Sequence, residues 1–176
     1  MVTKLKWLPI VGTGYNDTFF APAGTHVYNG AGGSQLKAHV WNWTSQGGMD
    51  IVDYKLAGNI ALNIDLSKTT MQNTGFGNAK FINIEGIAGT GGNDVFTDST
   101  ANNIFDGRGG NDTFNLTHGG NDTLLYRLLD TVDATGGNGQ DTANGFTIGT
   151  WEATLNADRI DISELLQGFS GTSENQ

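Results

Sequence analysis

The sequence predicts an all-β protein in which short parallel strands stack in flattened coils of about 18 residues. The main observation is a nine-residue period: Asp94, Asn103 and Asp112 are nine residues apart, and a Phe follows each of them two places later. One face of an α-helix repeats every three or four residues and one face of a strand every two, so neither element alone explains this period. A unit of one turn and one strand does explain it, and two units complete one coil.

Composition agrees with a single glycine-rich domain or one elongated stack of repeats. The 176 residues include 27 Gly, 2 Pro and no Cys, so disulfides cannot stabilise the fold. Residues 1–85 carry six Lys against five acids, whereas residues 86–176 carry three Arg against thirteen acids. The second half should therefore attract cations and repel nucleic acid and anionic lipid. No apolar run approaches a membrane span, and the amino terminus lacks the features of a secretory signal.

The first repeats are degenerate. Three nine-residue segments follow one another over residues 12–38, and their sixth positions hold Asp17, His26 and Gln35. This phase makes Gln35 the expected stacking neighbour of Asp17. The pattern returns at residues 45–53 with Asp50 in the sixth position.

Alternation of apolar and polar residues predicts longer strands elsewhere. These strands are expected at residues 51–66, 79–89, 123–129 and 145–151. Residues 73–79 are expected to form a turn, and residues 161–168 a short helix that ends at Gly168.

The best-formed repeats occupy residues 89–125. In each of them a three-residue strand such as Val95–Thr97 should point its middle side chain inward, which produces a buried row of Phe96, Phe105 and Phe114. The glycines of the six-residue turns supply the positive φ angles that the reversal requires and direct carbonyls between coils.

Stacked turns create an electrostatic problem that a divalent cation removes. Strands lie about 4.8 Å apart, so Asp94 should stack on Asp112. Two carboxylates about 5 Å apart at an effective dielectric near ~20 repel each other by roughly 3 kcal/mol. Ca²⁺ accepts about six to eight oxygen ligands in flexible geometry, whereas Mg²⁺ is smaller and dehydrates reluctantly, so several calcium ions are predicted. The candidate ligands are Asp17, Asp50, Gly89, Gly91, Asp94, Asn103, Gly107, Gly109, Asp112, Asp122, Asp133, Asp141 and Asp158.

Simpler interpretations exist for several of these residues. A Gly-Gly-Asn-Asp turn can be an ordinary hairpin with a solvated Asp, although copies in phase argue against this. Asp98 and Asp106 lie at repeat edges, where solvation is expected, and Asp158 and Asp161 fit either calcium ligands or N-terminal helix charges. The three His have no metal-ligand spacing, and no catalytic set of side chains can be assigned, so the sequence indicates a protein that is not an enzyme.

At this point the repeats can be compared with a known family. GTGGNDVFT (89–97) and GRGGNDTFN (107–115) resemble the G-G-x-G-x-D-x-U-x repeat of the RTX (repeats-in-toxin) family. The resemblance implies a calcium-binding parallel β-roll, a right-handed β-solenoid, with a small C-terminal capping segment. The roll would occupy residues 1–129, with degenerate repeats at 1–44, longer strand segments at 45–88 and the best repeats at 89–129.

The C-terminal part carries a second resemblance. Residues 121–169 are similar to the region that closes the repeat block in large adhesins exported by type I secretion. This implies that residues 130–176 form a cap associated with secretion, that an ABC transporter is a partner during export, and that the protein is secreted or held at the bacterial cell surface. The alternatives are a polysaccharide- or surface-binding module, for which Trp41 and Trp43 are the candidate contacts, and the noncatalytic tail of a secreted hydrolase.

Overall fold

The structure is a computed structural model that describes residues 9–30, 48–129, 137–149 and 156–166. Within these ranges the regular structure is β-strand, apart from one short 3₁₀ helix, η1 (Lys55–Ala57). The strands are β1 (Ile10–Val11), β2 (Thr18–Phe20), β3 (Gly24–Asn29), β4 (Ile51–Asp53), β5 (Asn63–Asp65), β6 (Gln72–Asn73), β7 (Gly77–Ile82), β8 (Gly86–Ala88), β9 (Val95–Thr97), β10 (Ile104–Asp106), β11 (Thr113–Asn115), β12 (Thr123–Leu125), β13 (Thr142–Asn144) and β14 (Arg159–Asp161). The predicted all-β class is therefore confirmed.

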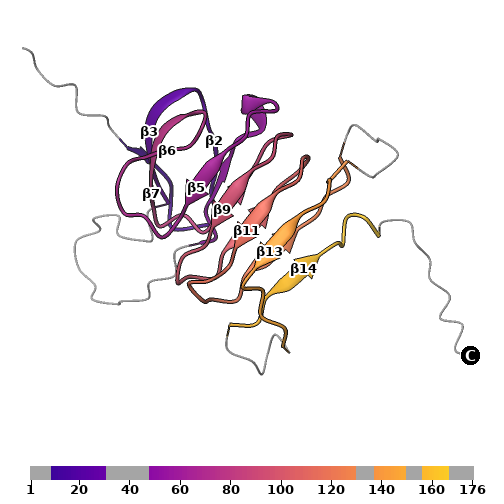
Figure 1. Cartoon of the computed structure of the whole chain (residues 1–176). Helices are drawn as coiled ribbons and strands as arrows, with labels where there is room; N and C mark the ends of the chain where they lie inside the picture. The colour runs from indigo at the N-terminus through magenta and orange to yellow at the C-terminus, as the bar shows by residue number, and fades with distance from the viewer. Residues whose placement is uncertain (1–8, 31–47, 130–136, 150–155, 167–176) are drawn as a thin grey trace, which may run out of the picture.

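The strands form three sheets. Sheet A has the order β1-β3-β7-β6, sheet B the order β14-β12-β10-β8-β4-β2, and sheet C the order β13-β11-β9-β5. Every pairing in sheets B and C is parallel. Figure 1 shows β5, β9, β11 and β13 side by side, in the order of sheet C.

From β8 onward, successive strands alternate between sheets B and C. Phe114 pairs with Phe96, and Phe105 with Ile87, so that partners in each sheet are separated by the predicted eighteen residues. The next partner of Phe105 is Leu124, nineteen residues on, because the turn before β12 contains one extra residue. The nine-residue period thus corresponds to one step from one sheet to the other.

The core lies between sheets B and C and is made by the middle residue of each short strand. Phe96, Phe105 and Phe114 are at most 1% exposed. The ring centroids of Phe96 and Phe105 are 5.6 Å apart, and those of Phe105 and Phe114 are 6.2 Å apart. The predicted Phe row is confirmed, and in this row each buried ring contributes roughly 3–5 kcal/mol relative to Ala.

The N-terminal part differs from the predicted array of three half-units. Asp17 does precede a short strand, β2, but residues 24–29 form the six-residue strand β3 in sheet A. β3 pairs with β7, and the ring of Tyr28 stacks on that of Phe81 at 5.9 Å. His26 is therefore a strand residue whose ring nitrogen lies 3.2 Å from the carbonyl of Ala23. Gln35 lies outside the described residues, and the strand that pairs with β2 is β4.

The single strand predicted over residues 51–66 is wrong. The chain forms β4 in sheet B, turns through η1 and Gly58 at φ +72°, and then forms β5 in sheet C. The alternation arose because each short strand buries its middle residue, Val52 or Ile64. Periodicity alone does not reveal that the chain changes sheet between the two.

Other local predictions need correction too. The expected turn at 73–79 is shorter, because β6 and β7 form an antiparallel pair around residues 74–76. The expected strand at 123–129 ends at Leu125, and residues 145–149 contain no strand. Residues 163–166 form a turn instead of the predicted helix, and the Ser163 N–H donates to Oδ1 of Asp161 at 3.0 Å.

The described part of the C-terminal region continues the same two sheets. β13 pairs with β11, and β14 pairs with β12. Ile160 occupies the inward position of β14 but is 56% exposed, whereas its partner Leu124 is 2% exposed. Leu165 and Leu166, two apolar residues near this end, are 41% and 50% exposed.

Candidate metal centre

A carboxylate or carboxamide side chain stands directly before nearly every strand of sheets B and C. Before the strands of sheet B these residues are Asp17, Asp50, Glu85, Asn103, Asp122 and Asp158, here termed the sheet B row. Before the strands of sheet C they are Asp94, Asp112 and Asp141, the sheet C row. The members of each row lie side by side because the strands that follow them pair in register.

Backbone hydrogen bonds connect the sheet C row. The N–H of Asp94 donates to Oδ1 of Asp112, and the N–H of Asp112 donates to Oδ1 of Asp141, both at 2.8 Å. Oδ1 of Asp94 in turn accepts the N–H of Leu62 at 2.7 Å. One oxygen of each carboxylate is thereby fixed, and the stacking of Asp94 on Asp112 agrees with the predicted phase.

The sheet B row is connected in the same way. Its bonds run from the N–H of Asp17 to Oδ1 of Asp50 (2.8 Å), from Asp50 to Oε2 of Glu85 (3.0 Å), from Asn103 to Oδ1 of Asp122 (2.7 Å) and from Asp122 to Oδ1 of Asp158 (2.9 Å). In this row the neighbour of Asp17 is Asp50. Gln35, which the repeat phase placed beside Asp17, lies outside the described residues. Asp158 is a member of the row and not a helix charge.

Glu85 is the row member that sequence reasoning missed. It precedes β8 just as Asp50 precedes β4 and Asn103 precedes β10, and Nδ2 of Asn103 donates to the Glu85 carbonyl at 3.1 Å. No Gly-Gly-x-Asp turn surrounds Glu85, so the repeat motif did not mark it. The available signal was an acidic residue directly before the short apolar stretch Gly86–Ala88.

The first glycine of each good turn makes room for a carboxylate oxygen. A Cβ atom at Gly89 would collide with Oδ2 of Asp94, and a Cβ atom at Gly107 would collide with Oδ2 of Asp112. The second oxygen of each Asp therefore lies against its own turn. At Asp94 this oxygen accepts the N–H of Thr90 at 2.8 Å.

Asp112 lacks the equivalent bond. Arg108 has a φ of +66°, and its N–H donates to Oδ1 of Asp106 (3.1 Å) instead of to Asp112. Asp112 is 1% exposed, and its Oδ2 has no hydrogen-bond partner among the described residues. An unpaired buried carboxylate oxygen is costly, so this atom fits a bound cation.

Burial raises the pKa values of Asp94, Asp112 and Asp122, and like charges add to the effect at Asp112 and Asp122. Burial raises the pKa of Asp112 to about 8, and the charges of Asp141 and Asp94 act in the same direction. Burial, with the charge of Asp158, raises the pKa of Asp122 to about 7, and burial raises that of Asp94 to about 6. The fold therefore disfavours the charged carboxylates that a divalent cation would neutralise.

The neighbouring glycines have different surroundings. The N–H of Gly109 donates to the carbonyl of Thr90 (3.2 Å), and Gly91 lies directly beside Gly109 in the adjacent turn. The carbonyl of Gly89 accepts a hydrogen bond from Nη1 of Arg108 at 2.7 Å. Among the candidate carbonyl ligands, Gly89 thus already has a protein partner.

Asp98 and Asp106 are buried, so the expectation that they are solvated is wrong. Asp98 is 0% exposed and accepts the backbone N–H of His118 at 2.8 Å, while the ring nitrogen Nδ1 of His118 lies 2.6 Å from its other oxygen. Asp106 is 3% exposed and forms an ion pair with Arg127 at 2.8 Å. His118 is the other feature that sequence reasoning missed, because it lies in the turn with the extra residue.

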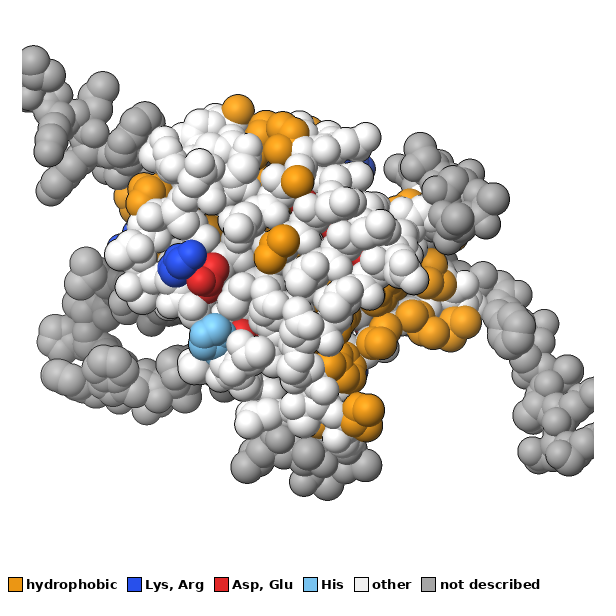
Figure 2. Space-filling model, viewed as in Figure 1, with side chains coloured by type: hydrophobic (Ala, Val, Ile, Leu, Met, Phe, Trp, Pro, Cys, Tyr) orange, Lys and Arg blue, Asp and Glu red, His pale blue; other side chains and the backbone are white. Residues whose placement is uncertain are grey.

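The structure brings the predicted ligands together as two rows of pairs, not as compact clusters. The described residues include no group of three or more His, Cys, Asp or Glu side chains placed to hold one metal ion. A calcium ion here would therefore need backbone carbonyls beside two carboxylates. Asp133 lies outside the described residues. Figure 2 shows few acidic side chains on the visible face, and Asp50, Asp94, Asp112 and Asp122 of the two rows are buried.

Comparisons with known proteins do not place the chain in a family. No model of a known protein family matches the chain, and no curated protein matches it either. In the described part of the chain, no helix is long and apolar enough to cross a membrane.

Proposed function

We propose that this chain is a non-enzymatic, calcium-dependent folding module of a secreted RTX-type protein. The observation that supports the proposal best is the buried, partnerless Oδ2 of Asp112, between Asp94 and Asp141 in a row of carboxylates. Two carboxylates per pair of turns, with carbonyls from glycine-rich backbone, are the oxygen ligands that Ca²⁺ accepts. Several ions would bind along the two rows.

The proposed architecture is a parallel β-roll, a right-handed β-solenoid with about 18 residues per coil. The alternation of strands between sheets B and C and the eighteen-residue register support it. Connections between parallel strands of one sheet are almost always right-handed, which supports the handedness. Residues 130–176 would form its C-terminal cap, into which β13 and β14 extend the two sheets.

Linkage explains how calcium would control folding. Without metal, the buried carboxylates oppose the folded state, and a cation that binds only this state supplies the missing free energy. Extracellular calcium modules bind at about 10⁻⁴–10⁻³ M, so the chain would stay unfolded in the cytosol and fold outside. Such a chain suits export by the ABC transporter of a type I secretion system to the medium or the bacterial cell surface.

An adhesin is the proposed parent protein, on the resemblance of residues 121–169. A secreted hydrolase could carry the same module as a noncatalytic tail. The sequence upstream of the module in the parent gene would separate the two, because the adhesive or catalytic domains would lie there.

A calcium titration tests the proposal. Chelator-stripped protein should give a disordered far-UV circular dichroism spectrum that changes to a β spectrum as calcium is added. Magnesium should be much weaker at equal concentration. A fully folded spectrum in excess EGTA would contradict calcium-dependent folding.

A further inference from the structure

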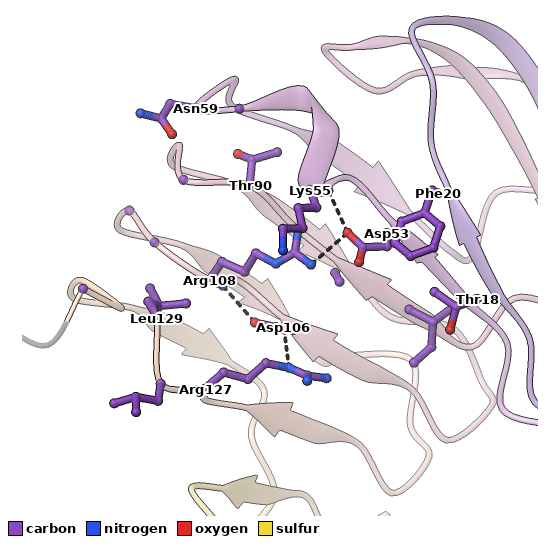
Figure 3. Close-up of a pocket in the computed structure, with 18 residues that line it drawn as sticks. Thr18, Phe20, Asp53, Lys55, Asn59, Thr90, Asp106, Arg108, Arg127 and Leu129 are labelled. Carbon is purple, nitrogen blue, oxygen red and sulfur yellow. Dashed lines mark hydrogen bonds and ion pairs between the residues drawn. The ribbon is translucent and has the colours of Figure 1, made fainter. Parts of the chain in front are cut away.

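A polar groove crosses the outer side of sheet B, where its strands end. Its volume is about 1030 Å³, and it touches β2, β4, β8, β10 and the segment after β12. Parallel strands are about 4.8 Å apart, so five strands span roughly 19 Å. Figure 3 shows Phe20 and Thr18 at one end, Leu129 toward the other, and Asp53 and Arg108 between them. The groove is therefore long enough for a linear ligand.

Two ion pairs shape the floor of the groove. Arg108 reaches from the end of β10 to Oδ1 of Asp53 at 2.8 Å, and it also donates to the carbonyl of Gly89. Arg127 pairs with Asp106 at 2.8 Å and with Glu164 at 3.3 Å. These contacts hold the charged groups in fixed positions without filling the groove.

Four exposed side chains remain available to a ligand. Lys55 is exposed, and its ammonium group has no ion pair among the described residues. Arg127 keeps 42% of its side chain exposed despite its ion pairs. Phe20 is 60% exposed at one end of the groove, and Asn59 offers an exposed amide. A free cation, a half-exposed guanidinium, an aromatic ring and an amide thus face one space.

The groove is a cationic region on an acidic protein. Three of the six Lys and Arg side chains in the described residues line it, against the two carboxylates of Asp53 and Asp106. The formal charge of the whole chain is −9. The groove should therefore attract anions locally, whereas the net charge of the whole chain would repel a ligand with very dense negative charge.

We propose that this groove binds a linear acidic polysaccharide. Sugar carboxylates would accept hydrogen bonds from Lys55 and Arg127, while a sugar hydroxyl would donate to the carboxylate of Asp53; the carboxylate of Asp106 is buried and already paired with Arg127. The exposed ring of Phe20 gives a sugar ring an apolar face to pack on. A nucleic acid carries too dense a negative charge for a chain of net charge −9, and a polyglutamate peptide has no side-chain hydroxyl to donate to Asp53.

Binding of short oligogalacturonates, measured by calorimetry in millimolar calcium, tests the proposal. Lys55→Gln and Phe20→Ala alter exposed side chains and should each weaken binding about threefold to tenfold. Lys68→Gln is the matched control, because Lys68 pairs with Asp65 outside the groove, and it should leave affinity unchanged. Arg127→Gln should weaken binding further but also leaves Asp106 without its partner, so its calcium midpoint must be measured too.

Three results would contradict the proposal that the groove binds a linear acidic polysaccharide. They are equal binding of a neutral dextran oligomer, tighter binding of polyglutamate than of the uronate, and no uronate binding by protein with a β spectrum. No carboxylate of either row lines the groove, so a loss of calcium-dependent folding would count against the proposed function and not against this site.

Discussion

Replacing Asp112 by Asn should have opposite effects with and without calcium. In the metal-free fold, the pKa of Asp112 is raised from 3.8 to about 8. At pH 7 the folded state must take up a proton there that the unfolded state does not bind. Each pKa unit corresponds to about 1.4 kcal/mol, so the buried carboxyl costs about 4 kcal/mol at pH 7. Asn removes the titrating group and keeps an oxygen for the N–H of Asp94, so Asp112→Asn should stabilise the metal-free fold.

With calcium present, Asp112→Asn should instead be less stable than the original chain. The variant loses one formal charge and the partnerless Oδ2 that fits a cation, so its calcium midpoint for folding should rise about tenfold or more. An osmolyte such as trimethylamine N-oxide favours compact states, so it can fold the metal-free chains for comparison. Circular dichroism should then show that Asp112→Asn needs less osmolyte than the original chain in EGTA, but more calcium without osmolyte.

Asp65→Asn is the control for this pair of measurements. Asp65 lies at the end of β5, outside both rows, and hydrogen bonds from Ser67 with the Lys68 charge lower its pKa against the effect of burial. Its loss should weaken folding slightly under both conditions. If Asp112→Asn also weakened metal-free folding, the argument from the buried charge would fail; an unchanged calcium midpoint would remove Asp112 from the ligands.

Three further predictions follow from the same contacts. Because burial raises the folded-state pKa values of Asp94, Asp112 and Asp122 from 3.8 to about 6, 8 and 7, the stability of the metal-free fold should be greatest near pH 4 and fall as pH rises from there to about 8. The concentration of an osmolyte such as sucrose that is needed to fold the chain in EGTA should therefore increase over this range, and a requirement that decreases would contradict this. Phe105→Ala should cost about 3–5 kcal/mol in urea unfolding with calcium, and a loss below about 1 kcal/mol would place the ring outside the core. Deletion of residues 130–176 removes β13 and β14 and exposes the edges of both sheets, so residues 1–129 should not fold cooperatively in millimolar calcium. If the shortened chain folded with the same calcium midpoint and steepness as the full chain, residues 130–176 would not be a cap.

The repeat-based part of the fold was predictable because one short motif determines several features at once. Phe96, Phe105 and Phe114 were expected in a buried row, and Asp94 was expected to stack on Asp112; the structure has both. In these turns each glycine, Asp and Phe has a separate physical reason to occupy its position. Because these local preferences all favour the same structure, it can be predicted from the sequence.

The remaining features depend on contacts that the sequence does not mark. The pairing of β2 with β4 makes Asp50 the neighbour of Asp17 across a long intervening segment, which no repeat count could reveal. Glu85 joins the sheet B row through strand register alone, without glycines around it. Nothing in the sequence marks Arg108, yet at its positive φ the Arg108 N–H donates to Asp106, which leaves Oδ2 of Asp112 without a partner among the described residues.

Direct measurement of bound calcium tests the central claim most closely. Equilibrium dialysis against 1–10 mM calcium, with the metal quantified by atomic absorption, should find more than one calcium per chain. Asp112→Asn should bind fewer ions than the original chain, and Asp65→Asn the same number. A folded chain that binds no calcium across this range would contradict calcium-dependent folding.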